Sequence, residues 1–147
     1  MKKLKIYLDF DGTVVEHQFP GIGRYNFGCI EVIKKLQVAG HEIILNTYRA
    51  DIEGEYLNEA LRWINEDYLK LLTNPQEAEN FKLDPITKFT KKKIHPSSLD
   101  FEVAEQTGEL FIDDISANTP LMDAVMSQTR MVDWAEMDLI FRENGVY

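Results

Sequence analysis

The sequence predicts an α/β fold, namely a three-layer, Rossmann-like domain in which a mainly parallel central sheet is flanked by helices. Short apolar runs alternate with amphipathic stretches, a pattern typical of strand–helix–strand units. Asp9, Thr47 and Asp113 each follow an apolar run, and such folds place ligands at the carboxyl ends of their strands. A chain of 147 residues suits one domain that buries roughly two thirds of its unfolded surface. We therefore expect a single domain over residues 1–147.

The first half of the chain predicts two strands and two helices in alternation. Residues 4–10 read as a buried strand, and a loop over 14–27 leads to a helix that Gly40 can end. Residues 41–46 form the second predicted strand. An amphipathic helix follows over 53–65, because its apolar residues share one face: Leu57, Ala60, Leu61 and Ile64.

The second half is less regular. Residues 69–73 are apolar enough for a third strand, and 76–96 read as a long polar excursion with a small hairpin that carries the lysines. The remaining predicted elements are a helix over 98–106, a strand that ends at Asp113, a helix after Pro120, a short strand near Met131 and a C-terminal helix from Trp134.

The segment 6–13 is the most informative, because an apolar run delivers Asp9 and Asp11 to a turn at Gly12. Side chains alternate along a strand, so both carboxylates fall on one side where the strand ends. Converging carboxylates require a cation or a proton between them, and hard oxygen ligands favour Mg²⁺. Asp9 is thus a candidate nucleophile and metal ligand, and Asp11 a candidate general acid and base.

The continuation Gly12-Thr13 adds specificity to this pair. Asp-Gly is common turn chemistry, so the two acids alone are a weak signal. The full string Asp-x-Asp-Gly-Thr arises by chance in roughly one chain per thousand of this length. With this string the chain resembles the haloacid-dehalogenase-like superfamily of aspartyl-phosphate phosphohydrolases. The resemblance runs from Leu4 to about Ala117 and implies three further motifs in a fixed order.

The second and third motifs of the family are a hydroxyl at a strand end and a lysine. Thr47 matches the hydroxyl, which can hydrogen-bond a phosphoryl oxygen, although Thr is also a common helix cap. Arg49 resembles the arginine that often follows, and it can pair with phosphate or with acidic neighbours. Of the lysines, Lys93 most resembles the family's residue because it precedes the apolar Ile94, with Lys91 and Lys92 as the other candidates.

The fourth motif is acidic, and Asp113 and Asp114 match it after the run Glu109 to Ile112. Adjacent side chains on a strand point to opposite faces. We therefore expect Asp113 to be the direct metal ligand and Asp114 a water-mediated or supporting one. Asp-rich turns also cap helices, so a structural role stays open for either residue.

The resemblance implies a Mg²⁺-dependent phosphatase. Asp9 would attack a phosphomonoester, Asp11 would protonate the leaving alcohol and then activate water, and Thr47 and Lys93 would offset phosphate charge. Mg²⁺ would be held by Asp9, Asp113 and the backbone carbonyl of Asp11, with Asp114 nearby. Dehalogenases of the superfamily lack the second acid, so Asp11 favours phosphate chemistry. Only 33 residues separate Thr13 from Thr47, which is too few for a helical lid and indicates a member without a large cap.

Two other function classes fit part of the pattern. A phospho-accepting signalling domain uses similar residues on a parallel sheet, but it pairs its acids at the first strand, whereas here the adjacent acids come last. A phosphate-binding interaction protein with weak or no turnover is the second alternative. A glycosyltransferase-type Asp-x-Asp metal site is not supported by the Gly12-Thr13 continuation.

The distribution of charged residues limits the classes of partner that the chain can bind. Residues 1–98 hold 14 basic and 14 acidic side chains, and 99–147 hold 2 and 11, so the net charge of −9 comes entirely from the last third. That distribution disfavours broad nucleic-acid binding, except at a phosphate-bearing end that approaches Lys88 and Lys91 to Lys93. No run approaches the ~20 apolar residues of a membrane span, and we expect a cytoplasmic protein. Nucleotides, sugar phosphates, polynucleotide ends and phosphoproteins all stay open as substrates. Cys29 is the single cysteine of the sequence, so no disulfide can form within the chain.

Overall fold

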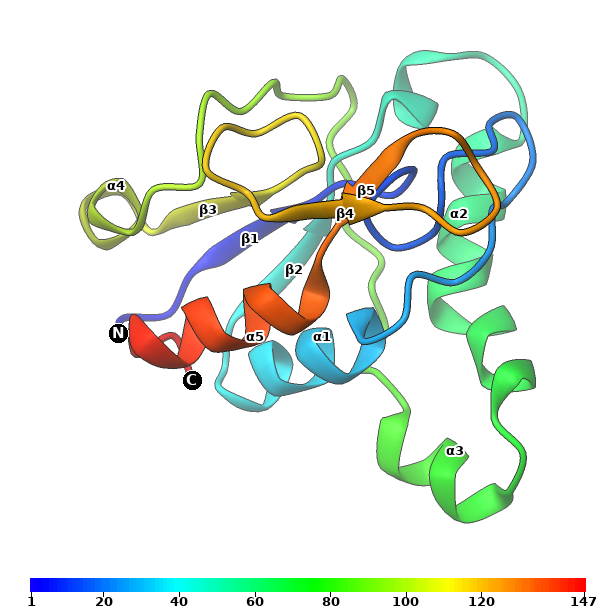
Figure 1. Ribbon diagram of the computed structural model, residues 1–147, viewed down its shortest axis with the longest axis horizontal. Coiled ribbons are helices and arrows are strands. Elements are labelled where there is room, and N and C mark those ends of the chain that lie inside the picture. The colour runs from blue at the N-terminus through cyan, green and yellow to red at the C-terminus, as the bar shows by residue number, and fades with distance from the viewer.

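The computed structural model describes all 147 residues and has an α/β fold whose parallel three-stranded sheet is flanked by helices, as predicted (Figure 1). The strands are β1 (Lys5–Leu8), β2 (Glu42–Leu45) and β3 (Glu109–Ile112), in the order β2–β1–β3. Leu8 lies beside Leu45 on one side and Ile112 on the other. All three strands therefore end at the same edge of the sheet.

An extended segment continues the sheet beyond β2. The amide of Leu45 donates to the carbonyl of Lys88 and the amide of Thr90 donates to the carbonyl of Leu45, each over 3.0 Å. This pairing brings the lysine-rich turn that follows Thr90 to the carboxyl end of β2. The central excursion of the chain thus returns to the sheet close to Thr47.

One face of the sheet carries the hydrophobic core. Ile6 and Leu8 are fully buried there together with the matching residues of the neighbouring strands. Two ten-residue helices, α1 (Cys29–Val38) and α5 (Trp134–Glu143), lie side by side below the strands in Figure 1. Burial of apolar side chains contributes about 25 cal/mol per Å², so this face supplies much of the stability.

Three shorter or more peripheral helices complete the structure. They are α2 (Tyr56–Asn65), α3 (Pro75–Phe81) and α4 (Phe101–Thr107), and α4 packs beside β3. Asn74 caps α3 by accepting from the Glu77 amide, and Asp100 caps α4 by accepting from two amides. No helix has both the length and the apolar character that a membrane span requires.

Three sequence-based predictions of secondary structure are wrong. Residues 69–73 do not form a strand, because Asp67–Leu71 is a 3₁₀ helix and the edge of β2 is already paired with the segment after Lys88. No hairpin forms over 76–96, which instead holds α3 and an extended segment. The stretch after Pro120 is β4 (Leu121–Asp123), and it pairs antiparallel with β5 (Arg130–Val132).

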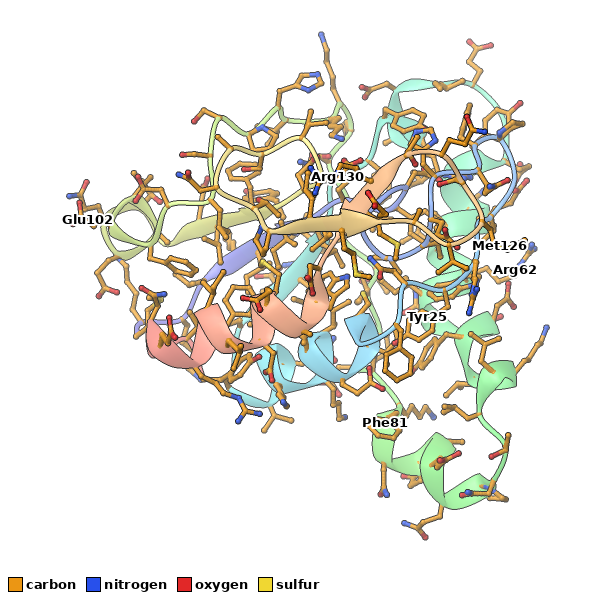
Figure 2. All side chains as sticks on the ribbon, in the orientation of Figure 1. Tyr25, Arg62, Phe81, Glu102, Met126 and Arg130 are labelled. Carbon is orange, nitrogen blue, oxygen red and sulfur yellow. The ribbon has the colours of Figure 1, made fainter.

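Two hairpins lie near the carboxyl ends of the strands. Residues 14–26, which we call the flap, fold back on themselves. The backbone amide of Glu16 donates to the Arg24 carbonyl, and the backbone amide of Asn26 donates to the Val14 carbonyl. Tyr25 marks the returning side of the flap in Figure 2, and Met126 lies at the tip of the β4–β5 hairpin. Glu16 accepts from the Met126 amide over 2.7 Å, so the two hairpins are joined.

Candidate functional site

Asp9 lies at the end of β1 and both its carboxylate oxygens have partners. Lys93 donates to Oδ1 over 3.1 Å and the Thr13 hydroxyl donates to Oδ2 over 3.2 Å. Asp9 is only 1% exposed. Thr13 is in turn fixed through its carbonyl, which accepts from the Asn26 amide group and from the Trp134 indole. The base of the flap therefore positions the aspartate that the sequence predicts as nucleophile.

Lys93 is the lysine that enters the site, as the sequence favours, whereas Lys91 and Lys92 are exposed. Two residues from other elements set this register. The Lys93 amide donates to Asp51 Oδ1 over 2.9 Å, and the Ile94 amide donates to Asn46 Oδ1 over 2.8 Å. Sequence reasoning did not identify Asn46, although its position directly before Thr47 at a strand end was a usable signal.

The acids of the fourth motif complete a cluster. Carboxylate oxygens of Asp9, Asp113 and Asp114 all lie within 4.8 Å of one another. The prediction that Asp113 and Asp114 point to opposite faces is therefore wrong. The strand ends at Ile112, so the alternation of faces no longer applies beyond it. A Cβ at residue 12 would overlap the Asp114 carboxylate, which explains why glycine with a φ of 80° is required there.

Thr47 is fully buried and caps the 3₁₀ helix Tyr48–Asp51. Its hydroxyl oxygen accepts from the Arg49 amide over 3.2 Å. This is the capping role that the sequence left open, and it is compatible with phosphate binding because the hydroxyl proton is not used in that bond.

Asp11 and Arg49 form a bidentate ion pair in the interior. Arg49 Nε donates to Asp11 Oδ2 over 2.7 Å and Nη2 donates to Oδ1 over 2.8 Å, and both side chains are 0% exposed. Arg49 also donates to the carbonyl of Gly21 in the flap over 2.8 Å and to that of Tyr56 over 3.3 Å. Of the two partners that the sequence allows for Arg49, the structure shows the acidic neighbour.

The electrostatics reflect burial of like charges around one cation. Burial, reinforced by Asp113, raises the pKa of Asp9 well above its usual range, although Lys93 opposes the shift. Burial raises the pKa of Asp114 to about 6. Burial alone would lower the pKa of Lys93, but the carboxylates of Asp9 and Asp113 outweigh it and raise that pKa. Three carboxylates are thus clustered around one lysine.

The donor set fits Mg²⁺. Asp113 is 1% exposed, and its Oδ2 has no hydrogen-bond partner, although Lys93 Nζ lies 3.1 Å away as an ion pair without hydrogen-bond alignment. Asp113 Oδ1 accepts from the Ile115 amide, which fixes the carboxylate. A buried carboxylate oxygen without an aligned hydrogen bond, inside a cluster of hard oxygen donors, suits Mg²⁺.

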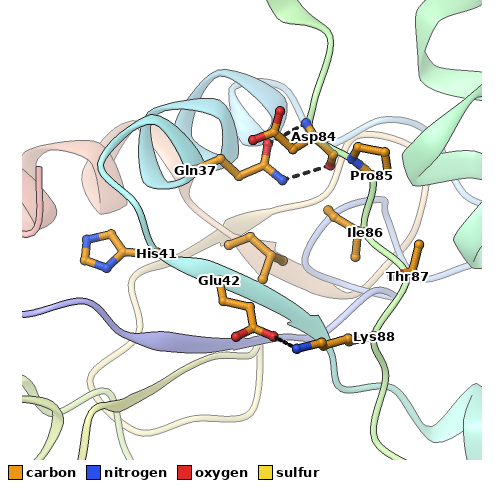
Figure 3. A pocket seen from close by; sticks show the side chains of 9 residues that line it. Gln37, His41, Glu42, Asp84, Pro85, Ile86, Thr87 and Lys88 are labelled. Carbon is orange, nitrogen blue, oxygen red and sulfur yellow. Dashed lines mark hydrogen bonds and ion pairs between the residues drawn. The ribbon is translucent and has the colours of Figure 1, made fainter.

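A separate cavity of about 210 Å³ lies at the opposite end of β2 (Figure 3). Several of its polar groups are paired within the chain. The Gln37 amide exchanges two hydrogen bonds with the backbone of Asp84, and Glu42 forms an ion pair with Lys88 over 2.6 Å. This cavity lies away from the acidic cluster.

Comparisons with known proteins concern the chain and its fold rather than individual site residues. No protein-family model matches the chain. A segment of 58 residues is 36% identical to a phosphoglycolate phosphatase of Nitrosopumilus maritimus, a match that covers 40% of the chain and 24% of that relative. The chain is also similar to a solved structure of a conserved protein from Bacteroides thetaiotaomicron, with 26% sequence identity and a TM-score of 0.51. The match covers 97% of this chain and 92% of that protein.

The sequence relative and the structural neighbour support the resemblance to the haloacid-dehalogenase-like superfamily that the motifs indicate. The match spans about a quarter of the phosphatase relative's length, so the activity and substrate of that relative do not transfer with it.

Proposed function

We propose that this protein is a Mg²⁺-dependent phosphomonoester hydrolase that acts through an aspartyl-phosphate intermediate. One observation carries the proposal. Asp9 is held by Lys93 and Thr13 inside a three-carboxylate cluster at the carboxyl ends of parallel strands. A fixed nucleophile, a buried cation and a set of hard oxygen donors are the groups that phosphoryl transfer needs.

In the first step, an oxygen of Asp9 forms a bond to phosphorus as the bond from phosphorus to the alcohol oxygen breaks. Asp11 gives its proton to that departing oxygen. In the second step, water loses a proton to Asp11 and attacks the phosphorus of the acyl phosphate, which releases phosphate and restores Asp9. Lys93 offsets the negative charge on the transferred group throughout, and the free proton of Thr47 can bond one phosphoryl oxygen.

Asp9, Asp113 and the backbone carbonyl of Asp11 are the groups that would hold Mg²⁺, with Asp114 beside them. Bound there, the ion would neutralise phosphate charge and bring the substrate against Asp9. The unbonded Oδ2 of Asp113 supports this assignment.

Arg49 constrains the role of Asp11. With both oxygens bonded to Arg49, Asp11 is a carboxylate, which is the form that accepts a proton from water in the second step. The first step requires the protonated form, so the binding of the phosphate ester must loosen this pair. The guanidinium also contacts the flap at Gly21, and loosening it would shift the flap at the same time.

Residues 1–147 would act as a single domain without a large cap, and the partner would be a phosphorylated substrate. The open classes are nucleotides, sugar phosphates, polynucleotide ends and phosphoproteins. Phosphoglycolate belongs in the test panel because one relative is a phosphoglycolate phosphatase.

The test measures phosphate release from p-nitrophenyl phosphate and from a panel of phosphate esters, with Mg²⁺ and with excess EDTA. We expect turnover with Mg²⁺ only, and Asp9→Asn should abolish it without loss of folded structure, because an amide cannot form the acyl phosphate. A tenth of wild-type activity in verified, non-deamidated Asp9→Asn protein would reject the nucleophile. Phosphate binding without any turnover by the wild type would instead support the binding-domain alternative.

A further inference from the structure

The hydroxyl of Tyr48 is buried and has no hydrogen-bond partner. Tyr48 lies between Thr47 and Arg49, at the start of the 3₁₀ helix that follows β2. Most buried side-chain polar atoms in proteins are hydrogen-bonded, and a buried hydroxyl without a partner destabilises the fold. An exception beside candidate catalytic residues therefore requires an explanation.

The nearest acid does not provide the missing partner. Burial raises the pKa of Tyr48, and the negative charge of Asp11 and a hydrogen-bonding contact with its carboxylate raise it further, so the hydroxyl lies close to Asp11. Both oxygens of Asp11 already accept short, well-aligned bonds from Arg49, and no aligned bond reaches them from Tyr48. The hydroxyl thus keeps its proton and has no well-aligned acceptor within the chain.

The flap holds the tyrosine ring in this position. Phe19 meets the ring edge-on with centroids 4.9 Å apart, and His17 lies nearly parallel to it at 6.4 Å. Phe19 also covers the guanidinium of Arg49, whose carbon lies 5.0 Å from the ring centroid, and Arg49 is bonded to Gly21. These contacts restrain the ring of Tyr48, so its hydroxyl is aimed before any ligand binds.

We propose that Tyr48 is a substrate-binding residue whose hydroxyl donates a hydrogen bond to an oxygen of the phosphate ester on the side of the leaving group. The proposal rests on the function proposed above. In that function Asp11 exchanges a proton with the leaving oxygen, so Asp11 and the neighbouring Tyr48 lie on the leaving-group side of the substrate. A neutral donor suits this position, since the site already contains the cations Lys93 and Arg49. The hydrogen bond that the folded chain lacks is then completed by substrate.

Tyr48→Phe tests this directly, because it removes the hydroxyl and keeps the ring. A hydroxyl whose partner is the substrate should give a 10- to 100-fold lower kcat/KM, on the scale of one hydrogen bond to a charged group. The midpoint of urea unfolding should stay the same or rise, because no bond within the chain is lost. Activity and stability therefore move independently.

Tyr68→Phe is the matched control. The Tyr68 hydroxyl has two partners in the chain, donating to the Phe81 carbonyl over 3.2 Å and accepting from the Leu83 amide over 2.7 Å. This variant should lower the unfolding midpoint and leave kcat/KM unchanged. An equal kcat/KM for Tyr48→Phe and wild type, or a fall in its unfolding midpoint like that of Tyr68→Phe, would overturn the proposal.

Binding of inorganic phosphate, measured by calorimetry in the presence of Mg²⁺, separates this proposal from the proposed function. If wild type hydrolyses no ester of the panel, the hydrolase assignment fails. A roughly tenfold weaker phosphate affinity of Tyr48→Phe would still support the hydroxyl as a ligand group. If wild type is active and Tyr48→Phe matches it in both kcat/KM and phosphate affinity, only the role of Tyr48 is rejected.

Discussion

Arg49→Met should be among the most destabilising substitutions in this protein. It removes the cation that pairs with Asp11 and leaves a carboxylate buried, with both side chains 0% exposed in the wild type. Solvent cannot screen such a charge, and removing one member of a buried pair costs about 3–5 kcal/mol. The loss includes the bonds from Arg49 to Gly21 and Tyr56. Against a total stability of about 5–15 kcal/mol, the effect is large but measurable.

Urea unfolding of a double-mutant cycle measures the pair itself. Asp11→Asn and Arg49→Met are made singly and together, and unfolding free energies are compared at neutral pH. The double variant should be less destabilised than the sum of the two single variants by about 2 kcal/mol, because the second change removes the charge that the first left unpaired. Stability is the readout, so the result does not depend on the catalytic role of Asp11.

The surface pair of Arg142 and Asp138 provides the control. Arg142 Nη2 lies 3.2 Å from Asp138 Oδ2, but its side chain is 59% exposed. Arg142→Met should therefore cost at most about 1 kcal/mol. If Arg49→Met costs no more than Arg142→Met, or if the cycle is additive, the buried pair does not stabilise the fold in the way we infer.

Three further predictions concern the site and the core. Of Lys91→Ala, Lys92→Ala and Lys93→Ala, only the last should lower kcat by roughly a hundredfold, because only Lys93 reaches Asp9 and Asp113; equal losses for all three would reject the assignment. Asp113→Asn should raise the Mg²⁺ concentration for half-maximal rate by more than about tenfold, and Asp114→Asn by less, since Asp113 carries the unbonded buried oxygen; a shift for Asp114→Asn alone would reverse the order. Cys29 should resist alkylation in native protein at pH 8 and react once urea unfolds the chain, because burial raises the pKa of its thiol; rapid labelling of native protein would contradict its position in the core.

The parallel sheet and the edge at which the site lies could be predicted from the sequence. Each apolar run is short and is followed by a polar residue that can bind metal or phosphate. Parallel strands bring the carboxyl ends of such runs together. Asp9 and Asp113 were placed in this way, and both lie in the cluster. The same local reasoning failed at residues 69–73, where apolar composition indicates a strand. Strand formation also needs a pairing partner, and at the end of β2 the segment 88–90 pairs with Leu45 instead, while Asp67–Leu71 forms a 3₁₀ helix.

The contacts that complete the site join residues far apart in the chain. Arg49 meets Asp11 across 38 positions, and Lys93 meets Asp9 across 84. No periodicity or local spacing specifies which of two charged residues becomes a partner after folding. A sequence could therefore indicate that Arg49 pairs with either phosphate or an acid, while only the fold shows that Asp11 is the acid within its reach.

The selection of Lys93 from three consecutive lysines shows what determines such a site. The three residues have the same side chain, so their own chemistry does not distinguish them. The turn is fixed by its backbone, because Asp51 accepts from the Lys93 amide and Asn46 accepts from the Ile94 amide. Asn46 also donates to the Ile94 carbonyl over 2.8 Å, which holds both polar groups of that residue. Since Asn46 directly precedes Thr47, the end of β2 positions the hydroxyl by covalent connection and the lysine by hydrogen bonds. Two groups of the phosphate site, 46 positions apart, are thus held by one strand end.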